Sequence, residues 1–472
     1  MRKLFGTDGI RAVAGEAPLD KRTIFAIGAA LATKLGNNPR IIMGMDTRES
    51  CPWIAATLTA GLRSAGATVD SAGIITTPAI AFLARKHGFS AGVVISASHN
   101  PWQDNGIKIF GGDGYKLPDE TELGIEKEIE KFLAIDADRV LTQELSSRPN
   151  PEQSDRGVER PAAWDADITT DLPEVNETYR AEYIRFLLEA VPGISLDNRH
   201  IVFDCANGAA SSVAPQLFES LHGTVDITHA SPDGRNINLH CGALHPEIVA
   251  AQVKVSGASI GITFDGDADR ALFADENGNV VNGDAVMLAC ARDLQARGEL
   301  ANNLVVATTM SNMGLEAAFA RSGIRMLRAP VGDKYVLEEM RNSGASLGGE
   351  QSGHILFPAR ATTGDGLLTA LLVLDLVHRS NKPLGQLIAD LTNYPQIILN
   401  VKVREKKPLD TFPTVVATIE AAELELKDTG RVVIRYSGTE ALARVMIEAA
   451  SAEAMHRHAN AIANAIRTEL GV

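Results

Sequence analysis

The sequence predicts an α/β protein with four domains around a central cleft: three related α/β domains with mixed or mostly parallel sheets, then a small α+β domain. At roughly 150 residues per domain, its 472 residues correspond to about three domains and leave room for a fourth. Three segments share one plan, in which an apolar strand-like run, a turn of small and polar residues and a helical pattern follow one another, as in βαβ units. These segments are RIIMGMDTRES from Arg40, HIVFDCANGAA from His200 and NLVVATTMSNMG from Asn303.

The C-terminal part of the chain has a different pattern. After a helical run over residues 367–391, the segments QIILNVKV, GRVVIRYS and ARVMIEAA alternate or run apolar like strands. Helical patterns over residues 413–425 and 452–470 separate and follow them. This succession predicts the small α+β domain.

Composition shifts along the chain place the domain boundaries. Residues 143–173 are rich in proline, serine and charge without an apolar period, which is typical of a linker or surface insertion. A helix from about Asn176 opens the second domain, and the third begins near Gly257, before the strand SIGITF. The expected domains are 1–160, 161–257, 258–380 and 381–472.

Charge and cysteine usage exclude several classes of protein. The chain carries 45 Lys and Arg against 59 Asp and Glu, a net charge of −14, which disfavours binding to nucleic acid or an anionic membrane. The most apolar run, GLLTALLVLDLV, is too short to span a bilayer and contains Asp375. We therefore expect a soluble enzyme of the reducing cytoplasm, because the cysteines stand far apart without a CxxC spacing. They are Cys51, Cys205, Cys241 and Cys290.

The first motif with chemical potential is VVISASHNPWQDNGIKIF, residues 93–110. A strand ends in small residues and exposes Ser98 at its carboxyl end, where open α/β sheets bind ligands. The dipeptide Asn105-Gly106 predicts a tight turn before Lys108, so that a hydroxyl and a lysine lie on neighbouring loops. An N-capping serine followed by a turn is the alternative. A serine hydrolase is disfavoured, because the G-x-S-x-G pattern is absent.

The second motif is GITFDGDADRALFADENGN, in which Asp265, Asp267 and Asp269 follow an apolar strand. Alternate carboxylates on one loop can converge on a hard divalent cation. An EF-hand is excluded, because its sixth loop position requires glycine and is Arg270 here. Three carboxylates predict Mg²⁺ whose coordination is completed by a phosphate oxygen. The alternative is a solvated acidic hairpin.

Two further loops offer groups for sugar and phosphate. In LGGEQSGHILF, paired glycines precede Glu350, Ser352 and His354, and the Glu and Ser side chains offer an acceptor and a donor to sugar hydroxyls. In VVIRYSGTEALARVMIE, a loop between two strand-like runs combines a guanidinium, hydroxyls and backbone N–H groups suited to a phosphate dianion. That loop contains Arg435, Ser437, Gly438 and Thr439. Taken alone, the first loop is better explained as a glycine-rich turn with one hydrogen-bonded histidine, and the second as an ordinary Ser-Gly hairpin.

The opening FGTDGIR adds two glycines and the cation Arg11. Together the loops supply a nucleophilic hydroxyl in the first expected domain, a metal cluster and a polyol-binding loop in the third, and a remote phosphate clamp in the fourth. A site built from loops of several domains lies in a central cleft.

These motifs, in this order, resemble those of the α-D-phosphohexomutase superfamily across essentially the whole chain. The forms FGTDGIR, ISASHNP, GGEQSGH and RYSGTE are most similar to the branch that acts on glucosamine phosphates. The resemblance implies four domains around a deep cleft and conversion of glucosamine 6-phosphate to glucosamine 1-phosphate, for UDP-N-acetylglucosamine synthesis. The close alternative is the same chemistry on glucose or mannose phosphates, and the distant one is a catalytically silent sugar-phosphate-binding protein.

The resemblance also implies roles for the motif residues. Ser98 would be carried as phosphoserine, with one Mg²⁺ held by that phosphate and by Asp265, Asp267 and Asp269. Glu350 and Ser352 would bind sugar hydroxyls, and the loop of Arg435, Ser437, Gly438 and Thr439 would bind the phosphate that does not react. Proton transfer and charge stabilisation would fall to Arg11, Lys108, Arg270 and His354, among which the general base stays open. Glucosamine 1,6-bisphosphate or a similar bisphosphate would be the activator, and a homodimer is left open.

The sequence departs from the family pattern at two places. Ala441 stands where the phosphate loop usually continues with proline, and Pro330 stands before VGD where many relatives have lysine. Lys334 follows at a position that is often arginine. We expect these departures to affect substrate binding more than chemistry.

Overall fold

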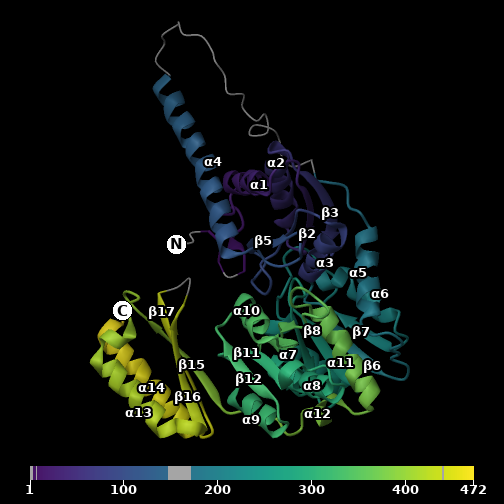
Figure 1. Cartoon of the computed structure of the whole chain (residues 1–472), viewed down its shortest axis with the longest axis vertical. Helices are drawn as coiled ribbons and strands as arrows, with labels where there is room; N and C mark the ends of the chain where they lie inside the picture. The colour runs from purple at the N-terminus through teal and green to yellow at the C-terminus, as the bar shows by residue number, and fades with distance from the viewer. Residues whose placement is uncertain (1–3, 7, 147–171, 438–440) are drawn as a thin grey trace.

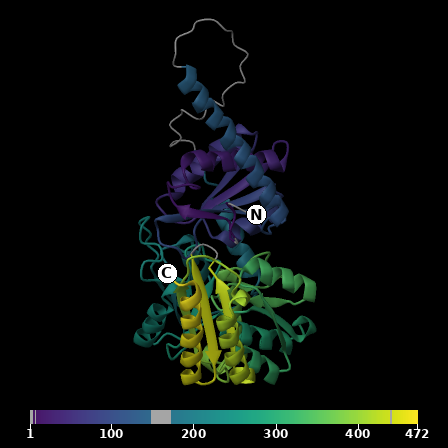
Figure 2. The same ribbon diagram turned by 90° about the vertical axis from the view of Figure 1, so that its left-hand side faces the viewer.

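The computed structural model describes residues 4–6, 8–146, 172–437 and 441–472, with only the backbone for 135–146. Figures 1 and 2 show a first domain at one end of the molecule, the second and third domains packed side by side beneath it, and the C-terminal domain beside the third. Each of the four units is built on its own sheet. Among the described residues, no helix is long and apolar enough to cross a membrane.

The first domain is a three-layer sandwich. Its sheet has the order β1-β5-β4-β2-β3. The helices α1, α2 and α4 pack on one face of this sheet, and α3 packs on the other. The elements are β1 (Ile10–Val13), α1 (Lys21–Leu35), β2 (Arg40–Met45), α2 (Cys51–Ser64), β3 (Thr68–Ile74), α3 (Thr77–His87), β4 (Ala91–Ile95), β5 (Asp104–Gly111) and α4 (Asp119–Ser146).

The second domain repeats this arrangement. Its sheet has the order β10-β9-β8-β6-β7, with β6, β7 and β8 parallel and β9 and β10 antiparallel to their neighbours. The elements are α5 (Thr178–Glu189), β6 (His200–Asp204), α6 (Ala214–Glu219), β7 (Thr224–Thr228), α7 (Pro246–Ser256), β8 (Ile260–Phe264), β9 (Ala271–Ala274) and β10 (Val280–Val281).

The third domain has a smaller sheet of the same type, in the order β12-β11-β13-β14. The strands β11, β12 and β13 are parallel, and β14 is antiparallel to β13. The elements are α8 (Gly283–Ala296), β11 (Leu304–Thr308), α9 (Met313–Arg321), β12 (Arg325–Ala329), α10 (Asp333–Ser343), β13 (Leu347–Gly349), β14 (Ile355–Leu356), α11 (Gly366–Ser380) and α12 (Leu384–Leu387).

The predicted relationship among these three domains is confirmed by their topology. The orders β3-β2-β4-β5, β7-β6-β8-β9 and β12-β11-β13-β14 correspond strand by strand, each with an antiparallel strand after three parallel ones. The strands β2, β6 and β11, which carried the repeated pattern in the sequence, occupy equivalent places. The loops after β4, β8 and β13 are therefore equivalent as well.

The expected boundaries of the third domain need correction. The strand β8 pairs in parallel with β6, with Ile201 opposite Ile260, so it belongs to the second sheet and not to a domain that begins at residue 258. The metal loop after β8 consequently lies in the second domain. At the other end, Leu384, Leu387 and Leu391 pack against the same core as α11, so the third domain continues beyond residue 380.

The C-terminal domain is the predicted small α+β unit. Its antiparallel sheet has the order β15-β17-β16, and α13 and α14 lie beside one another against it, as Figure 2 shows. The elements are β15 (Gln396–Lys402), α13 (Pro413–Leu426), β16 (Gly430–Tyr436), β17 (Leu442–Ala449) and α14 (Ala452–Leu470). It is joined to the third domain through Glu448, which accepts hydrogen bonds from Met313 N at 2.7 Å and Arg431 Nε at 2.6 Å.

Candidate functional site

Three of the predicted loops leave equivalent strands at the carboxyl edges of their sheets. Ser98 follows β4, Asp265 follows β8 and Glu350 follows β13. This is the edge at which open α/β sheets bind ligands. The first two loops meet directly, since Ser98 Oγ donates a hydrogen bond to Asp265 Oδ2 at 2.5 Å. The predicted nucleophile and the predicted metal cluster are thus one site, formed between the first and second domains.

Ser98 differs from the sequence expectation in its exposure. Its side chain is buried, with 1% of the residue exposed, because the metal loop of the second domain covers it. Its backbone has φ +53°, in the left-handed region that residues other than glycine and asparagine rarely adopt. His99 Nδ1 lies 3.4 Å from Ser98 Oγ. Burial, together with the nearby charges of Arg270 and Arg11, lowers the pKa of His99 to about 4.

The metal loop is a buried cluster of three carboxylates. One oxygen from each of Asp265, Asp267 and Asp269 lies within 4.8 Å of the others. Burial and the two neighbouring carboxylates raise the pKa of Asp265 well above its usual value. Two buried oxygens, Asp267 Oδ1 and Asp269 Oδ1, have no hydrogen-bond partner among the described residues. Buried oxygens without a hydrogen bond and like charges at this spacing are stabilised by a cation, so the cluster fits an oxygen-ligated metal ion.

A glycine permits the close approach of the two loops. A Cβ atom on Gly266 would lie 2.4 Å from the carbonyl oxygen of Ser98 and 3.0 Å from Asn238 Nδ2. Any larger residue would push the serine loop away from the aspartates. The contact is reinforced by Thr77, whose N donates to the Asp267 carbonyl at 3.0 Å and whose hydroxyl donates to the Asp267 carboxylate.

Lys108 reaches this cluster from the first domain. It lies within β5 and not on a loop, because Asn105 and Gly106 are themselves part of that strand. Its Nζ is 2.7 Å from Asp267 Oδ2 and 3.2 Å from Asp269 Oδ2. Burial opposes the charge of Lys108, but the carboxylates of Asp267, Asp269 and Asp8 outweigh it and raise the pKa of Lys108 well above its usual value.

The expected turn before Lys108 is absent for a physical reason. Gly106 pairs with Arg11 of β1 across the sheet, and its carbonyl accepts a hydrogen bond from Ser96 N at 3.0 Å. A Cβ atom at this position would lie 2.6 Å from the Ser96 carbonyl oxygen. The glycine is therefore required by close backbone packing, which the sequence interpretation mistook for a turn.

Sequence reasoning missed a group of charges behind Lys108. Asp8 Oδ2 is 3.0 Å from Lys108 Nζ, and Asp8 Oδ1 accepts from Lys116 Nζ at 2.6 Å. Lys116 also pairs with Asp333 Oδ2 at 2.7 Å, at the start of α10. Asp8 lies in the FGTDGIR segment and Asp333 is the aspartate of VGD, but neither was given a role, and Lys116 lies in no motif that we singled out. Only the folded chain brings these residues together.

The remaining predicted catalytic residues surround the same carboxylates. His354 Nδ1 is 3.5 Å from Asp269 Oδ1 and its Nε2 is 3.6 Å from Asp333 Oδ2. Burial opposes protonation of His354, but Asp269 and other carboxylates raise its pKa to about 9. Arg270 Nε is 3.7 Å from Asp269 Oδ1, and Arg11 forms an ion pair with Asp8.

The sugar loop of the third domain is internally organised. Glu350 Oε1 accepts from Gly332 N at 3.1 Å, and Glu350 Oε2 accepts from Ser352 Oγ at 3.1 Å. The loop also carries His354, which links it to the metal loop. The predicted sugar-binding residues therefore lie near the charged cluster, although the hydrogen bonds that the Glu350 carboxylate accepts come from its own domain.

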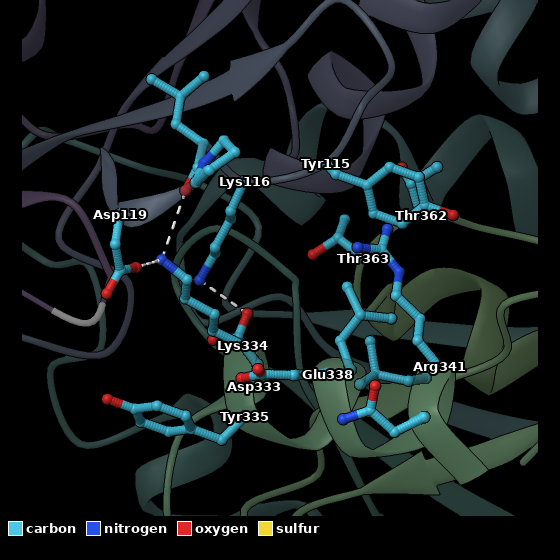
Figure 3. A pocket seen from close by; sticks show the side chains of 15 residues that line it. Tyr115, Lys116, Asp119, Asp333, Lys334, Tyr335, Glu338, Arg341, Thr362 and Thr363 are labelled. Atoms are coloured by element: carbon cyan, nitrogen blue, oxygen red, sulfur yellow. Dashed lines mark hydrogen bonds and ion pairs between the residues drawn. The ribbon is translucent and has the colours of Figure 1, made fainter. Parts of the chain in front are cut away.

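A cavity of about 400 Å³ borders this cluster, between the first and third domains. Figure 3 shows Lys116 pointing toward Asp333 and Lys334 toward Asp119 across it, with Arg341 beside Tyr115. Its volume is typical of small-molecule pockets. Ser98 and the three aspartates do not line it, so it adjoins the reactive cluster without containing it.

The phosphate loop of the C-terminal domain is only partly described. Gly438 and Thr439 lie outside the described residues. Arg435, near the end of β16, is exposed, and Ser437 is buried, with its carbonyl accepting a hydrogen bond from Lys406 Nζ at 2.7 Å. Within the described ranges, no hydrogen bond or ion pair joins Arg435 or Ser437 to the metal loop.

Comparison with known families accounts for almost the whole chain. Four domain profiles of the phosphoglucomutase/phosphomannomutase family match it: alpha/beta/alpha domains I, II and III over residues 2–134, 181–278 and 282–394, and the C-terminal domain over residues 398–465. The profile of domain II includes the metal loop, in agreement with the sheet topology.

Curated relatives match over the full length. The phosphoglucosamine mutase of Koribacter versatilis is 55% identical over 478 residues, which cover 100% of this chain and 98% of the relative. The phosphoglucosamine mutase of Solibacter usitatus is 48% identical over 473 residues, covering 100% and 99%.

Solved structures share the fold. A phosphoglucomutase/phosphomannomutase family protein from Burkholderia thailandensis has a TM-score of 0.74 at 23% identity and covers 99% of both chains. The N-acetylphosphoglucosamine mutase of Aspergillus fumigatus, in complex with GlcNAc-6P and magnesium, has a TM-score of 0.66 at 20% identity and covers 99% of this chain and 96% of that one.

Proposed function

The chain belongs to the phosphoglucomutase/phosphomannomutase family, and from this premise we propose that it interconverts glucosamine 6-phosphate and glucosamine 1-phosphate for UDP-N-acetylglucosamine synthesis. Members of this family are isomerases that move a phosphoryl group within a hexose. The observation that supports this chemistry best is the buried contact of 2.5 Å between Ser98 Oγ and Asp265 in the acidic loop. The choice of substrate is supported by the full-length relatives, which are phosphoglucosamine mutases.

Ser98 is proposed to carry the phosphoryl group as phosphoserine. In the first step the bond between Ser98 Oγ and phosphorus breaks, a bond from a sugar hydroxyl oxygen to the same phosphorus forms, and the hydroxyl proton passes to a base. Mg²⁺ held by Asp265, Asp267 and Asp269 would supply charge neutralisation for the phosphate when bound. Lys108 and Arg270 add fixed positive charge beside these carboxylates. Arg11, Lys108, Arg270 and His354 remain the candidates for proton transfer.

The sugar then carries two phosphates and must return the other one to Ser98. Glu350 and Ser352 would hold its hydroxyls in either orientation, and Arg435, Ser437, Gly438 and Thr439 would bind the phosphate that is not reacting. In the second transfer the bond between the original phosphate and its sugar oxygen breaks, a bond from Ser98 Oγ to that phosphorus forms, and a proton passes to the released sugar oxygen. This leaves phosphoserine and the isomerised monophosphate. Because the bisphosphate can leave before the second step, glucosamine 1,6-bisphosphate or a similar bisphosphate is expected to restore phosphorylation of Ser98 and so to activate the enzyme.

Preference for an amino sugar has a chemical basis. A 2-amino sugar is cationic near neutral pH, so the Glu350 carboxylate, beside the neutral Gln351 in the sugar loop, would favour it over the 2-hydroxyl of glucose. One hydrogen bond to a charged group is worth about 1.5–3 kcal/mol, on the order of tenfold to a hundredfold in rate. Residual turnover of glucose phosphate is therefore expected.

The carrier role is tested with Ser98→Ala and a control, Ser64→Ala, whose hydroxyl only donates to the Gly61 carbonyl within α2. Intact-mass analysis should show one phosphate on active wild type and on Ser64→Ala, and none on Ser98→Ala. Turnover should be lost only in Ser98→Ala. Full activity of Ser98→Ala would exclude the covalent mechanism.

Substrate choice is tested by comparing kcat/KM on glucosamine, glucose and mannose phosphates. We expect glucosamine phosphate to be preferred by about tenfold or more. If glucose or mannose phosphate is turned over at least as efficiently, the enzyme acts on those sugars with the same residues, and the amino-sugar assignment is wrong.

A further inference from the structure

We infer that Arg48 and Asn238 are positioning residues that hold the serine loop by its carbonyl groups and thereby keep Ser98 Oγ aimed at the metal loop. This inference rests on the proposed function, since it concerns the residue that carries the phosphoryl group. Arg48 lies in the segment RIIMGMDTRES, which served above only to identify the repeated fold, and Asn238 lies in no motif discussed above. Both donate to backbone carbonyls of the serine loop and not to Ser98 Oγ.

Two side chains from two domains bridge the same pair of carbonyls. Arg48 Nη2, from the first domain, donates to the carbonyl oxygen of Ser98 at 3.1 Å and to that of Asn100 at 2.6 Å. Asn238 Nδ2, from the second domain, donates to the Ser98 carbonyl at 2.9 Å and to the Asn100 carbonyl at 3.1 Å. The carbonyls of Ser98 and Asn100, the two neighbours of His99, thus each accept one hydrogen bond from the first domain and one from the second.

The backbone of Ser98 needs such support. A serine at φ +53° is in a sparsely populated conformation, which persists only where surrounding contacts hold it. If its carbonyl were released, the loop could relax to a common conformation and Oγ would leave Asp265. Ser96 Oγ accepts a hydrogen bond from Ser98 N at 2.9 Å, so the other end of the residue is fixed as well.

Both donors are themselves immobilised. Arg48 is buried and forms a buried ion pair with Asp46, which also accepts from Arg48 N at 3.0 Å. Asn238 is anchored by a hydrogen bond from its N to the Ala206 carbonyl at 2.9 Å and has φ +58°. A buried ion pair is a costly way to stabilise a fold, but it aims a donor accurately. The geometry therefore fits positioning better than stabilisation alone.

The consequence for the reaction is specific. Ser98 Oγ must present a phosphoryl group to one sugar oxygen and later accept another, without moving between the two transfers. Loss of one carbonyl donor should lower the rate of transfer while leaving sugar binding intact, because the sugar loop is in the third domain. A poorly aimed phosphoserine should also react more often with water than with sugar.

The test uses Asn238→Gly, since glycine keeps the positive φ and removes only the amide. Asn198→Gly is the matched control: Asn198 is exposed, lies in the same domain and has φ +60°. The readouts are kcat and KM for the hexose phosphate, and the lifetime of phosphoserine without sugar, followed by intact mass. A 1 Å misplacement can cost about a hundredfold in rate, so we expect kcat to fall about tenfold to a hundredfold in Asn238→Gly.

In Asn238→Gly, KM should stay within about twofold and the phosphoserine lifetime should shorten, whereas Asn198→Gly should match wild type in all three measurements. Should Asn238→Gly fail to fold, Arg48→Lys keeps a cation for Asp46 but loses the guanidinium fork, and it should show the same split between kcat and KM. Wild-type kcat and phosphoserine lifetime in a folded Asn238→Gly would refute the inference. Absence of turnover in wild type would instead refute the proposed function.

Discussion

The second domain contains two clusters of metal-ligating side chains at the same edge of its sheet, and they differ in how their oxygens are satisfied. Asp265, Asp267 and Asp269 follow β8, whereas Asp204 ends β6 and gathers His229 and Cys241 around it. In both clusters the ligand atoms lie within 4.8 Å of one another. Distance alone therefore does not distinguish them.

Hydrogen bonding does distinguish them. Asp204 Oδ1 accepts from Ala206 N at 2.9 Å and lies 3.1 Å from His229 Nδ1, and Asp204 Oδ2 accepts from Gly242 N at 2.9 Å. Asp267 Oδ1 and Asp269 Oδ1, by contrast, have no hydrogen-bond partner in the part of the chain that the structure describes. In the cluster of Asp265, Asp267 and Asp269, a bound metal ion would add to the positive charge of Lys108, His354 and Arg270 and stabilise the oxygens that lack a hydrogen bond. The Asp204 carboxylate is instead occupied by the backbone N–H groups of the turns around it.

The largest expected effect is on the metal loop. Asp267→Asn removes one ligand charge and one partner of Lys108, so turnover should fall by at least about a hundredfold, since metal stabilisation of a phosphoryl transfer is worth several kcal/mol. EDTA should abolish wild-type activity, and Mg²⁺ should restore it. Thermal denaturation with and without Mg²⁺ gives a second readout: the ion should raise the Tm of wild type and leave that of Asp267→Asn unchanged.

The second cluster supplies the control for this experiment. Cys241→Ser should keep wild-type turnover and the same Mg²⁺ dependence, because its thiol holds no catalytic ion. If Cys241→Ser loses Mg²⁺ activation, or if wild type works fully without a metal, the contrast between the clusters is wrong.

A smaller effect is expected from Asp204→Asn, on stability and not on metal binding. The substitution places an amide N–H₂ where the carboxylate accepts from backbone N–H groups, and an unsatisfied buried donor costs about 1–3 kcal/mol. Urea unfolding should show this loss in free energy, with an unchanged Mg²⁺ concentration for half-maximal activity. A change in Mg²⁺ affinity without a loss of stability would contradict the structural role of Asp204.

The contrast between the clusters also shows what the sequence could predict. The carboxylates of Asp265, Asp267 and Asp269 are close in the chain and follow a strand, so a local pattern sufficed to find them. Their unpaired oxygens, and the burial of Ser98, depend on the contact between two domains and could not be deduced from spacing. The same holds for Asp8, Lys116 and Asp333, which meet only after the first and third domains pack together.

The fold was predicted for similar reasons. The repeated strand–turn–helix pattern at Arg40, His200 and Asn303 identified three related domains, because β2, β6 and β11 are equivalent strands. The assignment of the strand SIGITF failed, since an apolar run does not reveal which strand will be its neighbour. The roles given to all the site residues remain predictions, and Gly438 and Thr439 in addition lie outside the described residues.

The smallest expected effect concerns the pH dependence of the second cluster. The hydrogen bond to Asp204 outweighs partial burial and raises the pKa of His229 above its ordinary 6.5. A raised pKa means that the protonated form stabilises the fold: this contribution is complete below about pH 6.5, the unfolded value, and is lost as pH rises through the folded pKa. The side chain is 31% exposed, so the charged part of the interaction is worth less than about 1 kcal/mol.

His229→Asn tests this dependence, since asparagine tolerates the φ of +46° at this position. The difference in free energy of unfolding between wild type and His229→Asn should be largest below about pH 6.5 and should narrow as the pH rises above that value. His222→Asn, at an exposed position with φ +62°, is the control. Its free energy of unfolding relative to wild type should not show this change with pH. If the loss of unfolding free energy in His229→Asn instead grew with pH, the folded protein would hold His229 neutral, as a metal ligand would be. The cluster around Asp204 would then resemble that of Asp265, Asp267 and Asp269.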